Sequence, residues 1–439
     1  MKKTWIRLDN AAKLFSTVTD KSDTQVFRLS CTLNSNIKPA LLQKALNQTI
    51  QSLPVFQFVL KKGIFWYYLE KTNLQPKIEK EHRPPCSPIL GRTGKSLLYE
   101  VTYYHNRINL EVYHVLADGS GAKFFLQTLI DRYLNLLAKK ASPAIKTSSL
   151  IPKKNLFSFD ISQFQMQDDS FDKYYQELPL PSPVAFIQDS AKLIRPPLLA
   201  AQVSGQKYNE HRLKIITGHL SVNQIHALAK KKGVTITTLL LAYLIQAIGN
   251  NLSTRAKKKP VIISVPVNLR QFFPSETLRN FFISVTVSYD FSLQKNSFSK
   301  ILKKVDQDLK NNLNQDLLLA NMAKFSAIEN NFLIKIIPLF LKNLILKIVY
   351  KFVSNFQVTA RLSNLGVVAF NSKAKNSQIT SLDFLNGTND LQVGVISYQD
   401  VLSISLVSPF LNTDISKDFF RSFTALGLDV KIFTNHLEP

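Results

Sequence analysis

Cysteine is scarce in this chain of 439 residues, which contains only Cys31 and Cys86. Neither cysteine belongs to a C-x-x-C pair or lies at a metal-ligand spacing from a histidine. The sequence therefore predicts that no metal is bound. Two isolated cysteines also favour a reducing compartment, and we expect a cytoplasmic protein.

Uninterrupted apolar runs are also missing at the start of the chain. The stretch MKKTWIRLDNAAKLF begins with two lysines, but Arg7, Asp9 and Asn10 break the apolar core that a secretory signal needs. We therefore expect no signal peptide.

The longest apolar segment is NFLIKIIPLFLKNLILKIVYKFV, residues 331–353. Four lysines and an early proline interrupt it, so it falls short of a continuous membrane-spanning stretch. A helix packed in the protein core is the favoured interpretation. A helix lying on a membrane surface is the second, and a membrane span is the third.

Acidic residues are few, because 30 Asp and Glu stand against 55 Lys and Arg, which gives a formal net charge of +25. Such a charge suits nucleic acid, an anionic membrane surface or a phosphate-bearing small molecule, and a Lys-rich composition bias also produces it. The lysines are spread along the chain, and no RNP-like, zinc-finger or Arg-rich segment is present. We therefore expect no nucleic-acid partner.

Length and a hydrophobic share of 45% predict a globular protein of two α/β domains. Residues 1–170 alternate strand-like runs such as FRLSCTL with helical spacing such as that of KPALLQKALNQTIQSL. Within them, LLYEVTYYHNRINLEVYHV contains two strand-like runs joined by the polar turn HNR, which predicts a hairpin. Residues 171–212 are predicted to be a proline-rich connection. Residues 213–439 return to mixed α/β patterns, and a ligand cleft is expected between the two domains.

The second domain is expected to begin with two consecutive helices, over about 222–232 and 237–249. Ser221 and Gln224 have the spacing of a capping box, and Gly233 is suited to end the first helix. Strand-like runs follow in PVIISVPVNL, FFISVTVSYDF and LQVGVISYQDVLSISLVSPF.

A histidine precedes Asp-Gly by four residues in INLEVYHVLADGSGAKFFLQTLIDRYL, residues 108–134. Strand alternation places His114 on the same side as Val112, Leu110 and Ile108, which is an apolar, inward-facing side. Burial keeps an imidazole neutral at physiological pH, the state that a general base requires.

The residues after His114 leave two alternatives open. Asp118 either orients His114 directly or turns away and braces the chain through an arginine, and bracing is favoured. Gly119, Ser120 and Gly121 are expected to form a flexible turn before a helix. A lone inward-facing histidine is more often an ordinary core residue, so motif and context must be weighed together.

The motif YHVLADGSG resembles the H-x-x-x-D-G signature of the coenzyme A-dependent acyltransferase superfamily, which includes chloramphenicol acetyltransferases and nonribosomal peptide condensation domains. The resemblance continues in order through WIRLDNAAKLF, GIFWYYLE, TITTLLLAYLIQAI, PVNLRQFFPSETLRNFF and RLSNLGVV. These segments are similar to a bacterial branch that resembles alcohol acetyltransferases, and they cover nearly the whole chain. The resemblance implies two chloramphenicol acetyltransferase-like subdomains with a tunnel at their interface.

The resemblance also implies roles for the motif residues. His114 would be the general base that deprotonates the acceptor as it attacks the thioester carbonyl. Asp118 and Gly119 would support the catalytic loop, with Arg270 as the salt-bridge partner of Asp118. Without the resemblance, Arg270 would be read as a solvated charge at the end of a strand.

Two further sites follow from the resemblance. Ser363 and Asn364 lie in a crossover segment where they would contact substrate or stabilise an oxyanion, with an ordinary turn as the alternative. The run Lys257, Lys258 and Lys259 is a candidate for contacts with coenzyme A phosphates, with a solvated loop as the alternative.

Two departures from family patterns limit what is carried over. Tyr113 stands where condensation domains have the first histidine of H-H-x-x-x-D-G, and the D-F-G-W-G motif of plant BAHD enzymes is absent. The substrates of those two groups are therefore not transferred to this chain.

The function that these observations favour is transfer of an acetyl or longer acyl group from acyl-CoA, a cosubstrate, to an alcohol or lipid acceptor, without a permanently bound cofactor. The second interpretation is transfer to an amine, or from the thioester of an acidic carrier protein. The third is a non-catalytic lipid-binding protein in peripheral contact with a membrane, against which His114 and Asp118 argue.

Overall fold

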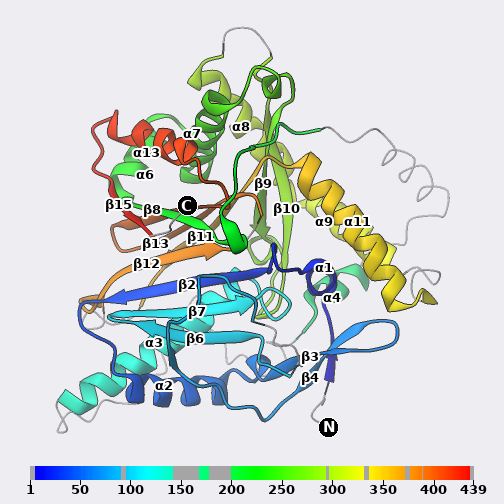
Figure 1. Ribbon diagram of the computed structural model, residues 1–439, viewed down its shortest axis with the longest axis vertical. Helices are drawn as coiled ribbons and strands as arrows, with labels where there is room; N and C mark the ends of the chain where they lie inside the picture. The colour runs from blue at the N-terminus through cyan, green and yellow to red at the C-terminus, as the bar shows by residue number, and fades with distance from the viewer. Residues whose placement is uncertain are drawn as a thin grey trace.

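The computed structural model in Figure 1 shows two α/β halves, one above the other. The structure describes residues 5–89, 95–141, 168–176, 199–292, 296–330, 336–370, 376–387 and 389–435. The α/β class predicted from the sequence is confirmed. Most of the predicted proline-rich connection, residues 177–198, lies outside the described residues.

The first half is built on a sheet with the strand order β12-β2-β7-β6-β5 in the described part of the chain. Its strands are β2 (Val26–Leu33), β5 (Glu79–Lys80), β6 (Tyr99–Tyr104), β7 (Arg107–Tyr113) and β12 (Ile379–Asn386). Strands β6 and β7 form the predicted hairpin, with His105 at φ 49 in the two-residue turn. A small sheet beside it has the order β1-β4-β3, from β1 (Trp5–Arg7), β4 (Tyr67–Lys71) and β3 (Phe58–Lys62).

Two helices bury their apolar sides in the core of the first half, α2 (Pro39–Ser52) and α3 (Gly119–Ala141). In α3, Phe125, Leu129 and Tyr133 recur at helical spacing and are fully buried. A third helix, α1 (Asn10–Val18), begins at Asp9, whose side chain accepts a hydrogen bond from the Ala12 backbone N–H.

The second half contains a sheet whose described strands have the order β10-β9-β11-β13-β14-β8-β15. These are β8 (Lys214–Ser221), β9 (Val261–Asn268), β10 (Phe282–Tyr289), β11 (Ala360–Val368), β13 (Leu391–Tyr398), β14 (Val401–Ser408) and β15 (Lys431–Thr434). Helices that share its core include α6 (Val222–Lys231), α7 (Ile236–Asn251), α8 (Phe298–Asn312) and α13 (Asp414–Thr424).

The two predicted consecutive helices are confirmed as α6 and α7. Ser221 Oγ accepts a hydrogen bond from the Gln224 backbone N–H, as the capping spacing predicts, and Gly233 has φ 66 after the end of α6. Helix α7 is apolar on nearly all sides because it packs inside the core of this half.

Strand β12 joins the two halves. It comes from the C-terminal part of the chain but pairs antiparallel with β2 in the first sheet. Strand β11 lies between β9 and β13 and continues toward α3 of the first half. Segments that are far apart in the sequence therefore meet at the contact between the halves. The candidate site lies at this contact.

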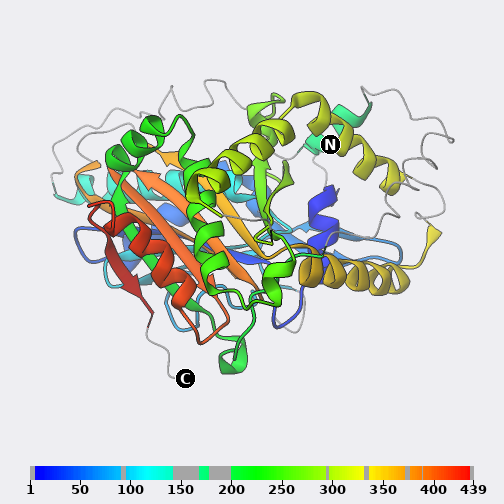
Figure 2. The ribbon, with the colours of Figure 1, turned by 90° about the horizontal axis from the view of Figure 1, so that it is seen from above.

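Three helices complete the described chain: α4 (Ser170–Gln176), α9 (Gln315–Asn330) and α11 (Leu339–Gln357). The prediction that residues 331–353 form a core helix is wrong for α11. This helix begins after Pro338 and packs against α1 at one side of the molecule (Figures 1 and 2). Many of its apolar side chains are exposed. The first five residues of the predicted helix, 331–335, lie outside the described residues.

Among the described residues, no single helix has the length and apolar composition to cross a membrane. Helices α6 and α7 pass this test only as a pair, with a bend of 85° between them.

Candidate active site

His114 follows directly after β7 and lies where the two halves meet. Its backbone N–H donates to Gln25 O at 2.9 Å, which extends the pairing of β7 with β2 by one residue. Its ring packs against Phe15 of α1, Phe27 of β2 and Phe282 of β10, with centroid separations of 4.5, 4.8 and 5.5 Å. The histidine is therefore enclosed by aromatic rings from both halves, while part of its surface stays accessible.

Asn280 fixes the orientation of the His114 ring. Its amide nitrogen donates to Asp9 Oδ1 at 3.1 Å, to Asp9 Oδ2 at 3.3 Å and to the backbone oxygen of His114 at 2.9 Å. These partners only accept hydrogen bonds, so the amide oxygen of Asn280 must be the atom that faces His114 Nδ1, at 3.1 Å. Nδ1 therefore carries the proton, and Nε2 keeps a free lone pair.

The surroundings of His114 also keep it neutral. Burial lowers the pKa of His114 below its ordinary value of 6.5, and this effect exceeds the opposite effects of the Asn280 hydrogen bond and the Asp118 charge. A neutral imidazole with a free Nε2 is the form that accepts a proton from a hydroxyl or an amine.

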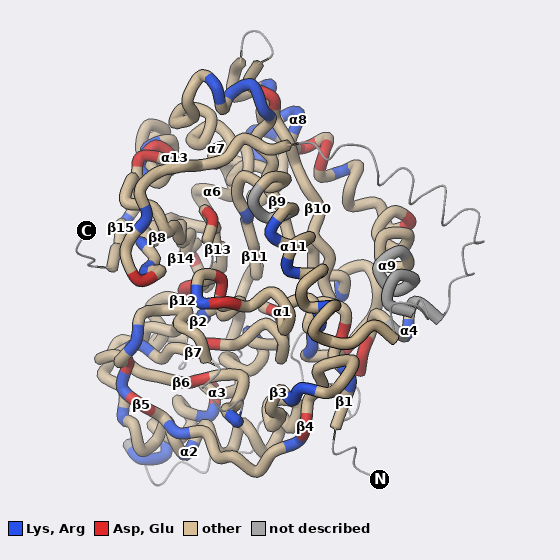
Figure 3. The backbone as a smooth tube through the Cα atoms, turned by 45° about the vertical axis from the view of Figure 1, so that its right-hand side comes forward, with Lys and Arg blue, Asp and Glu red and all other residues tan. Residues whose placement is uncertain are grey.

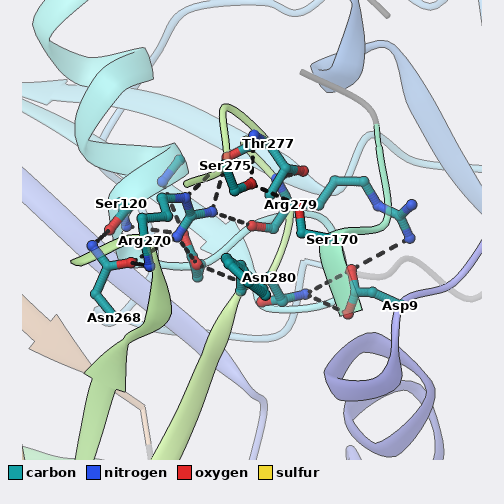
Figure 4. Close-up of polar contacts among 12 residues, drawn as sticks. Asp9, Ser120, Ser170, Asn268, Arg270, Ser275, Thr277, Arg279 and Asn280 are labelled. Carbon is teal, nitrogen blue, oxygen red and sulfur yellow. Dashed lines mark hydrogen bonds and ion pairs between the residues drawn. The ribbon is translucent and has the colours of Figure 1, made fainter. Parts of the chain in front are cut away.

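A buried charge pair, Arg279 and Asp9, lies beside Asn280 (Figure 4). Arg279 Nη2 lies 3.3 Å from Asp9 Oδ2 and donates to the backbone oxygen of Arg7 at 2.7 Å. Burial raises the pKa of Asp9 to about 6, against the opposing effect of Arg279. Asp9 thus anchors α1, Asn280 and Arg279 at one point beside His114.

Asp118 turns away from His114 and binds the second half. Its Oδ2 accepts from Arg270 Nη1 at 2.7 Å and from the Phe281 backbone N–H at 3.0 Å. Its Oδ1 accepts from the backbone N–H groups of Ser120 and Gly121, both at 3.0 Å. The structure thus brings Asp118 and Arg270 together in a buried ion pair.

Arg270 is held by its other donors as well. Its Nε and Nη2 donate to Thr277 O at 3.1 and 2.9 Å, and Nη2 donates to Arg279 O at 2.6 Å. The loop from β9 to β10, which carries Asn280, is therefore wrapped around this guanidinium (Figure 4).

Residues Gly119 to Gly121 form the first turn of α3, so the expected flexible turn is wrong. Asp118 supplies the hydrogen bonds that let a helix begin here, as an N-terminal capping residue does. The glycine at 121 serves close packing, because a Cβ atom there would lie 2.0 Å from the backbone oxygen of Leu278. At Gly119 a Cβ atom would meet the Leu365 side chain at 2.4 Å.

Ser363 and Asn364 lie in β11, on the segment that approaches the start of α3. The Asn364 amide is already engaged, since Nδ2 donates to Thr237 Oγ1 at 3.0 Å and Oδ1 accepts from the Gly366 backbone N–H at 2.8 Å. The backbone oxygen of Leu365 accepts from Lys123 Nζ of α3 at 2.9 Å. This segment therefore joins the halves beside the motif helix.

The lysine run lies away from the other candidates. Lys257 and Lys258 are in a short turn of 3-10 helix and Lys259 follows it, before β9 begins. Arg270 follows the other end of β9, about 25 Å away at the usual rise of about 3.3 Å per residue. The structure thus does not bring the lysines together with His114.

Asn280, Asp9 and Arg279 are the residues that sequence reasoning missed. Asp9 directly precedes a segment with apolar residues at helical spacing, a pattern that indicates a helix N-cap. The sequence alone could therefore have identified Asp9 as a capping residue. No local pattern shows that Asn280 meets His114, because the two residues are 166 positions apart and the contact depends on the arrangement of the two halves.

Comparison with known proteins rests on structure alone, since no protein-family model and no curated protein sequence matches this chain. The starter condensation domain of rhizomide synthetase RzmA, in a variant bound to C8-CoA and Leu-SNAC, superposes with a TM-score of 0.63 at 12% identity, covering 95% of this chain and 93% of that one. The TRI3 trichothecene 15-O-acetyltransferase from Fusarium sporotrichioides has a TM-score of 0.59 at 12% identity, with coverages of 95% and 93%. The first condensation domain of the calcium-dependent antibiotic synthetase gives 0.60 at 12%, with 94% of both chains covered.

The chain has the chloramphenicol acetyltransferase-like fold. Both subdomains of this fold are represented, because the superpositions extend over nearly the whole chain. Condensation domains, an O-acetyltransferase and this protein thus share the chloramphenicol acetyltransferase-like fold. The tunnel at the interface of the two subdomains, which the motif resemblance implies, remains a prediction.

For the acyl transfer that is proposed below, with His114 as the base, we expect Asn280→Ala to lower kcat by about 10- to 100-fold, because the His114 ring loses the acceptor that fixes its tautomer. Asn280 also raises the pKa of His114, so its loss should move the acid limb of the kcat/KM profile to lower pH. Rate measurements between pH 5 and 8 test both effects. A lower rate with an unmoved limb would mean that Asn280 is only structural.

Proposed function

We propose that this protein transfers an acetyl or longer acyl group from acyl-CoA to the hydroxyl group of a small alcohol or lipid, with His114 as the general base. The observation that carries the proposal is the Asn280 contact, which leaves a neutral His114 between the two halves, with no hydrogen-bond partner for Nε2 among the described residues. The fold supports the same reaction class, because solved structures that share it include an O-acetyltransferase.

In the proposed reaction, Nε2 of His114 takes the proton of the acceptor hydroxyl while its oxygen attacks the thioester carbonyl. The tetrahedral intermediate then expels the coenzyme A sulfur, which receives the proton from the imidazolium Nε2–H. The ester and the free thiol are the products, and no covalent enzyme intermediate forms. Asn280 Oδ1 accepts from the Nδ1–H throughout and so favours the transient imidazolium.

The supporting residues keep their proposed roles around this step. Asp118, Gly119 and Arg270 hold the start of α3 against the loop that carries Asn280. Ser363 is proposed to contact substrate or the oxyanion, whereas Asn364 would first have to leave its present partners. The lysine run at 257–259 lies far from His114. It would therefore contact only the nucleotide end of coenzyme A, which is remote from the thioester.

A second candidate reaction is condensation with an amine, or use of a carrier-protein thioester as the donor. It is favoured by the condensation domains among the structural neighbours, one of which was solved with an acyl-CoA and an aminoacyl thioester analogue. The net charge of +25 would suit an acidic carrier protein.

The test is release of free thiol from acetyl-CoA, longer acyl-CoA and acyl thioesters of a phosphopantetheine analogue, each with alcohols and with amines. Turnover with acyl-CoA and an alcohol is the expected result. Turnover only with an amine, or only with the phosphopantetheine thioester, would replace the proposal by the second candidate. If acyl-CoA neither turns over nor binds, the coenzyme A proposal is wrong.

A further inference from the structure

Helix α11 exposes its apolar side chains to solvent, whereas a helix of a globular protein normally buries them. Its outer face consists of apolar residues at helical spacing, and most of them are more exposed than buried: Phe340, Leu344, Ile345, Ile348, Val349 and Phe352. Phe340 is 67% exposed and Ile348 is 61% exposed. A contiguous apolar surface of this kind marks a contact with another molecule.

The inner face of α11 is held by polar side chains instead. Lys342 is only 4% exposed, lies 3.5 Å from the Trp66 ring centroid and donates to Phe65 O at 3.2 Å. Asn343 Oδ1 accepts from Thr17 Oγ1 of α1 at 3.2 Å. Two turns further along the helix, Tyr350 OH donates to Asp23 Oδ2 at 3.1 Å.

These inner contacts fix the rotation of the helix. Turning α11 to bury its apolar face would bring Lys342, Asn343 and Tyr350 into solvent and break their hydrogen bonds. The exposed apolar face is therefore built into the packing of α11 against α1 and the neighbouring hairpin.

The tip of the β3–β4 hairpin continues the apolar face. The backbone N–H of Leu339 donates to Ile64 O at 3.1 Å, so the tip adjoins the first turn of α11. Ile64 is 79% exposed and Phe65 is 44% exposed. Helix and tip together form one surface, which we name the α11 surface: the outer face of α11 with Ile64 and Phe65.

Positive charge borders the α11 surface. Lys347 and Lys351 are exposed, four residues apart, and project from one edge of the outer face at the helical angle of 100° per residue. Residues 330–382 contain no Asp or Glu, and Figure 3 shows that no acidic residue interrupts α11. Apolar residues flanked by lysines are the composition of helices that lie in the headgroup region of a bilayer.

We propose that the α11 surface docks this protein on an anionic lipid bilayer, with the apolar side chains in the outer layer and Lys347 and Lys351 at the lipid phosphates. A second copy of the chain is a poorer occupant, because a symmetric pair would bring four lysines together without an acidic partner on the helices. Docking requires no acyl-transfer activity. It places the bilayer one helix away from His114, since α1 contacts α11 through Thr17 and contacts the His114 ring through Phe15.

The experiment is co-sedimentation of the full chain with vesicles of phosphatidylcholine alone and of phosphatidylcholine mixed with phosphatidylglycerol. A charge of +25 by itself attracts an anionic vesicle, so the deciding variant keeps the charge. Phe340→Ser with Ile348→Ser is expected to weaken binding to the mixed vesicles by about tenfold or more. The matched control, Leu426→Ser with Ile432→Ser, changes two half-exposed apolar residues outside the α11 surface and should bind within about twofold of wild type.

A second matched pair tests the lysines. Lys347→Gln with Lys351→Gln is expected to weaken binding to the mixed vesicles more than Lys230→Gln with Lys231→Gln, which removes the same charge from the exposed end of α6. Equal loss from both pairs would overturn the placement of the lysines at the bilayer.

Three results would overturn the proposal as a whole. The first is unchanged vesicle binding by the Phe340→Ser, Ile348→Ser variant. The second is a wild-type protein that ignores both vesicles, and the third is a dimer that this variant dissociates, which would make a second copy the occupant. His114→Ala is expected to bind vesicles like wild type, so failure of docking and failure of the proposed catalysis are distinguishable.

Discussion

His114→Ala is expected to lower kcat/KM for acyl transfer by about 10²–10⁴-fold, the usual contribution of a positioned general base. The substitution removes the only group that, in the proposed mechanism, takes the acceptor proton. Binding of acyl-CoA should change little, because the imidazole acts on the acceptor and not on the nucleotide. The measurement is free-thiol release by wild type and variant, with circular dichroism to show that both are folded.

His219→Ala is the matched control for this experiment. His219 lies in β8, contacts an aromatic ring, Phe433, and has a carboxylate partner, with Nε2 at 2.8 Å from Asp383 Oδ1. It has no part in the proposed reaction and should leave kcat/KM within about twofold of wild type. Equal losses from the two substitutions would show that histidine removal acts through the fold, and His114 would then be structural.

Asp118→Ala is expected to lower the free energy of unfolding by about 3–5 kcal/mol, because it leaves the Arg270 guanidinium buried without its carboxylate. The same change removes the acceptor of three backbone N–H groups, at Ser120, Gly121 and Phe281. Asp118→Asn keeps the shape and one carbonyl acceptor, so its effect should be smaller. Guanidinium unfolding monitored by tryptophan fluorescence gives both values.

Asp306→Ala is the control for the charge pair. Asp306 binds Lys310 at 2.6 Å on α8, but the lysine side chain is 72% exposed, so the pair should contribute at most about 1 kcal/mol. If Asp118→Ala and Asp306→Ala shift the unfolding midpoint equally, the Asp118–Arg270 contact does not stabilise the joint between the halves.

Local patterns were enough to predict the α/β class, the β6–β7 hairpin and the helices α6 and α7. In each case the signal lies within about fifteen residues: a two-residue polar turn, a capping spacing before Gln224, or a glycine with positive φ. The pairing of Arg270 with Asp118 came from resemblance to a known motif, because no local rule relates two residues 152 positions apart.

The residues that hold His114 could not be predicted from local pattern. Asn280 reaches the ring only because the loop between β9 and β10 wraps around Arg270, and β12 reaches the first sheet only because the chain crosses between the halves. Both features depend on pairing between distant segments. Sequence periodicity carries no information about such pairing.

Helix α11 shows a different limit. Its apolar residues repeat at helical spacing, and the usual inference is that such a stripe faces the core. Here Lys342, Asn343 and Tyr350 find partners on the inner side, and these contacts outweigh the pattern. Periodicity identified the helix, but only the partners of its polar residues determine which face is outside.

The pH dependence of kcat/KM for wild type and His114→Ala tests the central claim most directly. Because burial holds the pKa of His114 below 6.5, the wild-type profile should be flat near pH 7 and fall only below pH 6.5, as His114 becomes protonated. The residual activity of His114→Ala should lack this acid limb. A limb that persists at the same pH in the variant would assign it to another group, such as Asp9, whose pKa burial raises to about 6, and would contradict the role of His114 as the base.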